Sequence, residues 1–212
     1  MSFDVICFDC DSTLSKIEGI DELAKRVGLG DELAELTNAA MNGDVALEDI
    51  YAKRLNLIKP SRADIEWLST LYISELVDGV ESVFRQLAQH NKSVHIISGG
   101  LLPAILPLAK ILNVPQSHIH AVDIYFDNNG QYLGYDIASP LTKNGGKAVM
   151  IESLKSHNVV MIGDGQTDLE AQKVGAKVIG FGGVISRDTV RNKADFFVEE
   201  CDFRKILTFN LI

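Results

Sequence analysis

Two carboxylates one residue apart, Asp9 and Asp11, follow directly after the apolar run Val5–Phe8. Such a run is typical of a buried strand, whose interior tolerates no unpaired charge, so both side chains should lie where the strand opens into a loop. Asp, Ser and Thr are also ordinary turn and capping residues, and the stretch 9–13 taken alone has that simpler explanation. A chemical role therefore depends on which other residues reach the same place.

Polar residues suited to chemistry also follow two later apolar runs. Ser98-Gly99-Gly100 follows one of them, and Gly163-Asp164-Gly165 follows the other, with Asp168 shortly after. Lys147 lies between the two, behind a pair of glycines. Each group alone could be a turn, a helix cap or a solvated lysine. Because ligands bind at the carboxyl ends of parallel strands, their order on successive strand ends favours one shared site.

These residue types suit phosphoryl transfer. Asp9, Asp11 and Asp164 offer the hard oxygen ligands that Mg²⁺ prefers, and Mg²⁺ can also bind a substrate phosphate. One carboxylate can attack phosphorus to form an aspartyl-phosphate, while another donates a proton to the leaving oxygen and later takes one from water. The hydroxyl of Ser98 and the N–H groups after it suit phosphate oxygens, and Lys147 would balance their charge.

After about residue 78, short apolar runs alternate with amphipathic helical stretches. The runs cover 93–97, 159–162, 177–181 and 196–198, and the helical stretches cover 80–90, 103–112, 146–156 and 168–174. This alternation predicts an α/β fold with a doubly wound, mainly parallel sheet. The stretch 122–137 is an exception, because alternating apolar residues flank an Asn-Gly turn and predict a hairpin.

Between the first strand and that alternating region, apolar residues recur at spacings of three and four from Ile20 to Leu71. The pattern breaks at 28–30, 42–43 and 59–61, which predicts several short helices joined by tight connections. We therefore expect a helical cap over residues 15–75, inserted directly beside the two aspartates. Residues 1–14 and 76–212 would form the α/β catalytic core domain.

Composition excludes several classes of function. The chain has 212 residues, 46% of them hydrophobic, and a formal net charge of −9. Long-range repulsion opposes binding to nucleic acid or to an anionic membrane, and no apolar segment approaches the roughly 20 residues of a membrane span. Three cysteines, an odd number, argue against a disulfide framework. We interpret Cys7 and Cys201 as packing residues and Cys10 as a spacer, and expect a cytoplasmic protein.

The motifs resemble those of the haloacid dehalogenase-like phosphatase superfamily over nearly the whole chain. Asp9-Cys10-Asp11-Ser12-Thr13 matches its nucleophile motif, and Ser98-Gly99-Gly100, Lys147 and Asp164 with Asp168 match its other three. The cap stretches 18–24, 40–41 and 53–62 and the stretch 181–183 resemble the branch that acts on phosphoserine. Two residues depart from common forms: Leu101 stands where the family often has Phe, and Thr167 where many members have Asn.

The resemblance implies a Rossmann-like core and a role for each matched residue. Asp9 would be the nucleophile, Asp11 the general acid and base, and Lys147 the third catalytic residue, with Asp168 supporting them from behind. Mg²⁺ would be held by Asp9, Asp11 and Asp164. Glu18 and Arg54 would bind the amino acid part of the substrate. The full set of matched substrate-binding residues is Glu18, Met41, Arg54, Ser98, Gly99, Gly100 and Thr167.

The function implied is hydrolysis of O-phospho-L-serine to L-serine and phosphate, the last step of serine biosynthesis. One alternative is a related phosphatase or phosphotransferase acting on another small phosphomonoester. Another is a phospho-accepting receiver-type signalling domain, which is disfavoured by the second aspartate and by the helical insertion. We expect a small-molecule substrate and neither nucleic acid nor membrane as partner. A homodimer is compatible with the sequence.

Overall fold

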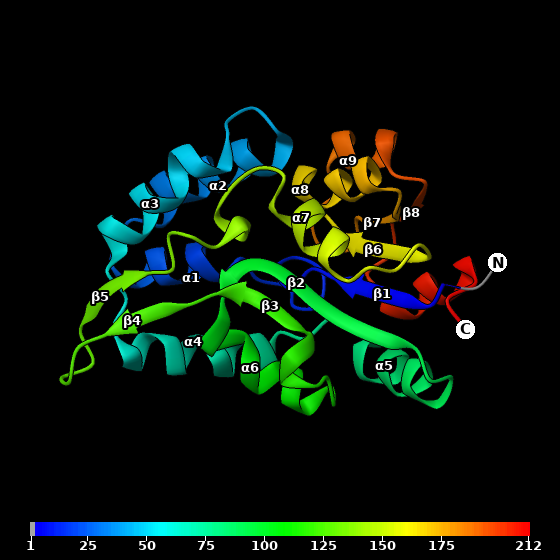
Figure 1. Ribbon diagram of the computed structural model, residues 1–212. Coiled ribbons are helices and arrows are strands. Elements are labelled where there is room, and N and C mark those ends of the chain that lie inside the picture. Colours follow the sequence, from blue (N-terminus) through cyan, green and yellow to red (C-terminus); the bar gives the residue numbers. More distant parts are fainter. Residues whose placement is uncertain (1–2) are drawn as a thin grey trace.

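Six parallel strands form the centre of the computed structural model, which describes residues 3–212 (Figure 1). Their order across the sheet is β3-β2-β1-β6-β7-β8. Bounds are β1 (Val5–Phe8), β2 (Ser93–Leu101), β3 (Ile119–Val122), β6 (Val159–Gly163), β7 (Lys177–Phe181) and β8 (Phe196–Val198). The chain winds outward from β1 in one direction and then from β6 in the other. This confirms the doubly wound α/β fold, and the reversal lies between β1 and β6.

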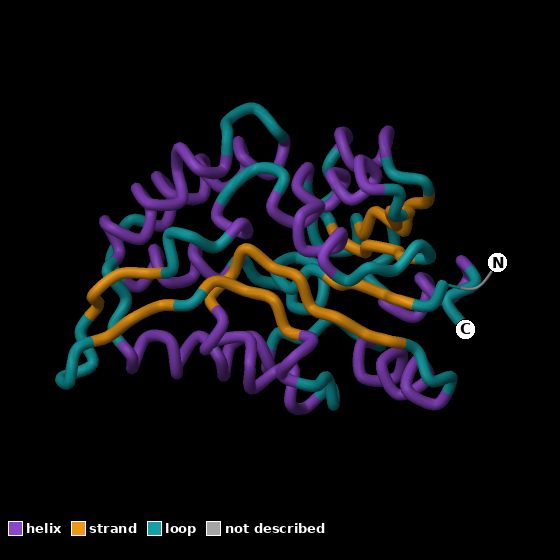
Figure 2. Tube along the Cα trace, in the orientation of Figure 1, coloured by secondary structure: helices purple, strands orange, loops and turns teal. Residues whose placement is uncertain are grey.

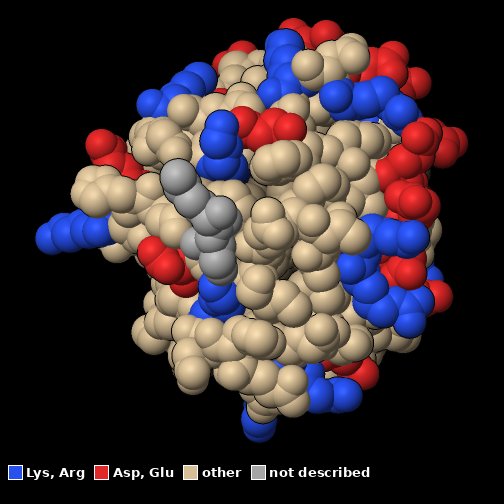
Figure 3. Space-filling model, turned by 90° about the vertical axis from the view of Figure 1, so that its right-hand side faces the viewer, with Lys and Arg blue, Asp and Glu red and all other residues tan. Residues whose placement is uncertain are grey.

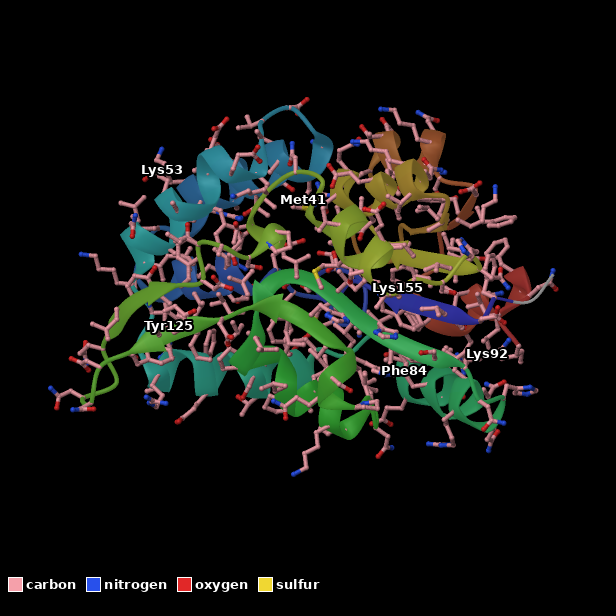
Figure 4. All side chains as sticks on the ribbon, in the orientation of Figure 1. Met41, Lys53, Phe84, Lys92, Tyr125 and Lys155 are labelled. Atoms are coloured by element: carbon pink, nitrogen blue, oxygen red, sulfur yellow. The ribbon has the colours of Figure 1, made fainter. Side chains whose placement is uncertain are left out.

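Helices cover both faces of the sheet, and β1 and β6 are therefore buried along their whole length. In Figure 1, α5 and α6 lie on one face and α7, α8 and α9 on the other. Phe84 of α5, labelled in Figure 4, packs on Phe8 with ring centroids 4.8 Å apart. Bounds are α5 (Val80–Gln89), α6 (Leu102–Ile111), α7 (Gly146–Ser153), α8 (Gln166–Leu169), α9 (Asp188–Lys193), with 3₁₀ helices η1 (Gln116–His118), η2 (Pro140–Thr142), η3 (Glu170–Val174) and η4 (Phe203–Phe209).

Four helices lie between β1 and α5, and we call them the cap. They are α1 (Gly19–Arg26), α2 (Gly30–Asn42), α3 (Leu47–Ile58) and α4 (Arg62–Ser74). Helix α2 ends at Gly43 in the left-handed conformation, and α4 begins with a capping box between Ser61 and Asp64. The segment leaves and re-enters the core at one place, where Ser15 and Leu76 form an isolated antiparallel bridge. The boundaries of a separate cap domain stay a prediction, since α4 also packs along α6.

The expected hairpin is present as a two-stranded antiparallel sheet, β4 (Ile124–Phe126) and β5 (Tyr132–Tyr135). Figure 2 shows it reaching away from the main sheet toward the cap helices. The ring of Tyr135 packs at a tilt against that of Tyr51 of α3, with centroids 5.2 Å apart. The backbone N–H of Arg62 in α4 donates to the carbonyl of Gly130 in the turn, 2.9 Å. The hairpin therefore braces α3 and α4.

Three elements differ from the sequence-based prediction. Strand β2 continues through Ser98, Gly99 and Gly100, which we expected in a loop, and its pairing with β3 shifts register between Ile97 and Leu101. The irregularity bends the strand where it meets the cap. Strand β3 was not anticipated, because it is only four residues long and half-buried in its middle. The helix expected over 168–174 is divided into α8 and η3.

Charged side chains of both signs alternate on the face near the chain ends, around a broad area without charge (Figure 3). Across residues 3–212, no helix combines the length and the apolar character that crossing a membrane requires.

Candidate active site

A pocket opens between the carboxyl ends of β1, β2 and β6 and the cap, with about 590 Å³ of empty space when its open mouth is included. Of the residues that the sequence suggested, every one except Asp168 lines it. The complete lining is Asp9, Asp11, Glu18, Ile20, Thr37, Met41, Leu47, Tyr51, Arg54, Ser98, Gly99, Gly100, Leu141, Lys143, Lys147, Asp164 and Thr167. Leu101, where we noted a departure from family forms, is buried and does not line the pocket.

The loop after β1 is held in an uncommon conformation. The backbone N–H of Asp9 still bonds to the carbonyl of Ile162, 2.9 Å, so the first aspartate lies at the last rung of the sheet. Ser12 has φ 49°, a left-handed conformation that costs energy for a side chain other than glycine. Its hydroxyl donates to Glu18 Oε1 at 2.7 Å. The turn therefore ties the aspartate loop to the start of α1.

Lys147 lies between two buried carboxylates. Its Nζ is 2.7 Å from Asp9 Oδ2 and 2.6 Å from Asp168 Oδ1. Burial alone would lower the lysine pKa, but Asp168 and Asp9 together outweigh it and raise that pKa. Asp168 also accepts the backbone N–H of Gly165, 3.0 Å, and a Cβ on Gly163 would collide with its carboxyl group. Asp168 thus fixes the ammonium group that faces Asp9.

Asp11 has a different environment from Asp9. Its Oδ1 accepts hydrogen bonds from Tyr72 Oη and from the backbone N–H of Gly19, both 2.7 Å. Burial and the charge of Asp9 raise the pKa of Asp11, more than these two hydrogen bonds lower it. Two neighbouring carboxyls whose environments differ in this way can serve as nucleophile and proton donor.

The irregular end of β2 forms one wall of the pocket. Ser98 Oγ accepts the N–H of Gly100, 3.0 Å, and lies 3.5 Å from Asp11 Oδ2. A Cβ on Gly100 would approach Asp11 Oδ2 to 2.9 Å, so only glycine allows this close passage of the strand. The carbonyl of Gly99 accepts a hydrogen bond from Tyr51 Oη of the cap, 2.8 Å.

A group of acidic side chains at the pocket floor fits a metal ion. Carboxylate oxygens of Asp9, Asp164 and Asp168 lie within 4.8 Å of one another, and all three residues are buried. Burial raises the pKa of Asp164 despite the guanidinium of Arg187, and hard oxygens without enough positive charge suit a divalent cation. The side chain of Asp11, which we expected in the ligand set, lies outside this group and faces Tyr72.

The cap contributes a buried arginine. Arg54 Nη1 donates to Thr37 Oγ1 at 2.7 Å, and that hydroxyl donates to Asp21 Oδ1 at 2.5 Å. The Nε of Arg54 is buried without a hydrogen-bond partner among the described residues. Glu18 also lines the pocket, and burial, followed by the charges of Asp11 and Asp164, raises its pKa. An arginine with an unused donor and an acid thus line the same cavity.

The remaining predicted substrate residues also reach the pocket. Met41, on α2, lies at the junction of the cap with the core (Figure 4), and its sulfur packs against Gly165. Thr167 is buried in the first turn of α8, next to Asp168.

Sequence reasoning missed several residues at the site. Tyr72 and Thr37 come from cap helices with no local motif, so nothing in the sequence marked them. Arg187 is buried, with Nε 3.2 Å from Asp164 Oδ2 and Nη1 3.2 Å from Asn38 Oδ1 of α2. It follows the carboxyl end of β7, so the strand-end rule applied to that strand would have indicated it.

Comparison with known proteins gives consistent results. Residues 3–174 match the haloacid dehalogenase-like hydrolases. Phosphoserine phosphatase from Bos taurus is 38% identical over 210 residues, covering 97% of this chain and 92% of the relative.

Solved structures agree. A phosphoserine phosphohydrolase-like protein from Francisella tularensis superposes on this chain with a TM-score of 0.88 and is 28% identical in sequence. A phospho-aspartyl intermediate analogue of phosphoserine phosphatase superposes with a TM-score of 0.82 and is 25% identical. Each superposition covers 99% of both chains. The chain therefore belongs to the haloacid dehalogenase-like hydrolases and, within them, to the phosphoserine phosphatase family.

Proposed function

We propose that this protein hydrolyses O-phospho-L-serine to L-serine and phosphate in a magnesium-dependent reaction, with Asp9 as the nucleophile. One observation carries the proposal. A carboxylate beside a buried lysine, Asp9 with Lys147 at 2.7 Å, faces a pocket that is also lined by Arg54, with an unused donor, and by Glu18. The first pair suits a phosphate and the second suits an amino acid.

In the first step, an oxygen of Asp9 attacks phosphorus, and the bond from phosphorus to the serine oxygen breaks. Asp11, whose pKa is raised by burial and by Asp9, gives its proton to the departing oxygen. Lys147, the hydroxyl of Ser98 and the N–H of Gly99 would bind the equatorial phosphate oxygens, where charge develops. The products are L-serine and an aspartyl-phosphate on Asp9.

In the second step, water attacks the phosphorus of the aspartyl-phosphate. Asp11, now ionised, takes a proton from that water, the bond from phosphorus to Asp9 breaks, and phosphate leaves. Both carboxylates return to their starting states. The hydrogen bonds from Tyr72 and Gly19 keep Asp11 in place through both steps.

Mg²⁺ is the metal that we propose for the acidic group. Asp9 and Asp164 would supply carboxylate oxygens, and Asp11 remains a predicted ligand. Asp168 already accepts hydrogen bonds on both oxygens, so its proposed role is to hold Lys147. A bound Mg²⁺ would supply positive charge to the substrate phosphate, which a protein of net charge −9 otherwise repels.

Specificity for serine would come from the cap. Arg54 is a planar donor that can bind a carboxylate through two parallel hydrogen bonds, and Glu18 can accept from the substrate ammonium. The cap over residues 15–75 would act as a lid that excludes water when substrate is bound. Free thiols at Cys7, Cys10 and Cys201 suit the reducing cytoplasm, where we place the protein and its role in serine biosynthesis.

The decisive experiment compares phosphoserine with p-nitrophenyl phosphate, which has neither ammonium nor carboxylate, with and without Mg²⁺. Arg54→Ala should lower kcat/KM for phosphoserine by about two orders of magnitude, because a desolvated charge-assisted pair contributes on the order of 2 to 3 kcal/mol. The same variant should leave p-nitrophenyl phosphate hydrolysis nearly unchanged. Equal losses on both substrates would show that Arg54 serves the phosphate or the fold.

A further inference from the structure

Helix α3 lacks an N-terminal cap from its own neighbourhood. Its N-cap residue is Ala46, which has no side-chain acceptor. The acceptor comes instead from the core, 97 residues away in sequence: Asn144 Oδ1 accepts the backbone N–H of Leu47 at 3.1 Å. In return, the backbone N–H of Asn144 donates to Glu48 Oε2 at 2.9 Å. The two hydrogen bonds form a reciprocal capping arrangement between two separate parts of the chain.

We propose that Asn144 is a positioning residue, which caps α3 across the pocket and so sets Arg54 over the substrate. The proposal rests on the proposed function, because it concerns how the arginine reaches the amino acid part of phosphoserine. No motif of the sequence marks Asn144, and it does not line the pocket.

The face of α3 explains how an effect at one end reaches the other. Leu47, Tyr51 and Arg54 are spaced by four and three residues, so they share one face of the helix, and all three line the pocket. Asn144 holds the first of them through its backbone, and Gly99 holds the second through the hydroxyl of Tyr51, 2.8 Å. Arg54 therefore lies on a helix that is hydrogen-bonded to the core at Tyr51, one turn before it, and at Leu47, two turns before it.

The charges near the start of α3 favour the hydrogen bonds between Asn144 and that helix. Glu48 is exposed, and its pKa is lowered chiefly by the N–H of Asn144, with Lys143 adding to the effect. The carboxylate of Glu48, which accepts the N–H of Asn144, is therefore ionised across the neutral pH range. The next residue, Asp49, is an exposed acid of the same helical turn and has no side-chain hydrogen bond or ion pair among residues 3–212. Its replacement changes the first turn of α3 but leaves both hydrogen bonds of Asn144 in place, so it serves as the control.

The other cap helix near the rim is attached independently. Arg187 bonds to Asn38 and Asn42 of α2 and is paired with Asp164. Loss of the Asn144 cap should consequently loosen α3 and leave α2 in place. Kinetic effects should then appear in the contacts that Arg54 makes and not in those of the phosphate.

The test uses Asn144→Ala in the full chain, with Asp49→Ala as control. Because loss of a capping acceptor typically weakens a helix start by a factor of about five, we expect KM for phosphoserine to rise about fivefold with kcat nearly constant. Kinetics with p-nitrophenyl phosphate should not change. In an Arg54→Ala background, the further change Asn144→Ala should have no added effect on phosphoserine, because the residue acts through the arginine.

Hydrogen exchange of the Leu47 amide gives a readout that needs no substrate. Exchange should accelerate about fivefold in Asn144→Ala and stay constant in Asp49→Ala. Equal loss on both substrates, an additive effect in the Arg54→Ala background, or unchanged Leu47 exchange would overturn the proposal. If the unmodified protein fails to hydrolyse phosphoserine, the proposed function is wrong, while the Leu47 exchange still decides whether Asn144 caps α3.

Discussion

The two sides of the pocket differ in how their charges are paired. On the core side, Lys147 bonds to both Asp9 and Asp168, and Asp168 accepts a further N–H. On the cap side, Arg54 reaches a carboxylate only through the hydroxyl of Thr37, and its Nε has no partner among the described residues. The ammonium group of Lys147 is thus paired with two carboxylates before substrate binds, whereas Arg54 keeps an unused donor.

This difference follows from what each side does in the proposed reaction. Groups that stabilise developing charge act best when they are already oriented, because no reorganisation is then needed during the reaction. Groups that select a substrate gain specificity when they stay unpaired without it, since a buried donor left unsatisfied is costly. The comparison predicts large losses in kcat for changes on the core side and increases in KM for changes on the cap side.

The largest effect is expected from Asp9→Asn. The amide keeps the shape but lacks the attacking charge, so kcat should fall by at least about 10³-fold. Lys147 retains Asp168 as a partner, so the fold should survive. Phosphate release and a thermal unfolding curve measure the two outcomes. A variant that kept a tenth of the turnover would remove Asp9 from the role of nucleophile.

Asp164→Asn should have the next largest effect. An amide oxygen is a poorer Mg²⁺ ligand than a carboxylate, so activity at ordinary Mg²⁺ should fall by about 10²-fold and recover partly as Mg²⁺ is raised. Titration of kcat against Mg²⁺ for both proteins is the measurement. A loss that is independent of Mg²⁺ would instead assign Asp164 to holding Arg187.

Thr37→Val tests the cap side. It keeps the size of the side chain but breaks the hydrogen bonds to Arg54 and Asp21, so KM for phosphoserine should rise about tenfold with a smaller change in kcat. Thr37→Ser retains the hydroxyl and should behave like the unmodified protein. A fall in kcat on p-nitrophenyl phosphate as well would contradict the division between the two sides.

A histidine cluster away from both sides gives the smallest effect. His95 stacks on His118, centroids 4.1 Å apart, and its Nδ1 is 3.3 Å from His120 Nε2. Burial, then His118 and His120, lowers the pKa of His95 to about 4. Between about pH 6.5 and 4 the unfolded state consequently binds more protons, so the free energy of unfolding should fall as pH falls through that window.

Urea unfolding at pH 7 and pH 5 measures this loss. His95→Phe should flatten the pH dependence, and replacement of His90, an exposed residue at the end of α5, should not change it. If the free energy of unfolding depends on pH equally in both variants, the histidine cluster is not the cause of that dependence.

The sequence by itself determined the parts of the site that are local. Asp9 and Asp11, Ser98 and Asp164 each follow an apolar run that had to become a buried strand, and parallel strands bring their carboxyl ends to one edge. The hairpin was equally local, because an Asn-Gly turn and alternating apolar residues lie within one short stretch. Strand β3 gave too short a pattern, with a half-buried middle, to be distinguished from a loop.

Tertiary structure alone decided which partners complete these groups. Tyr72 meets Asp11 across 61 residues, and Asn144 caps α3 across 97. The environment that separates Asp11 from Asp9 depends on burial and on those distant donors, so two identical residue types became chemically different only on folding. A side chain's spacing along its own helix or strand is set by local backbone geometry, whereas the atom it faces is set by how the cap packs against the core.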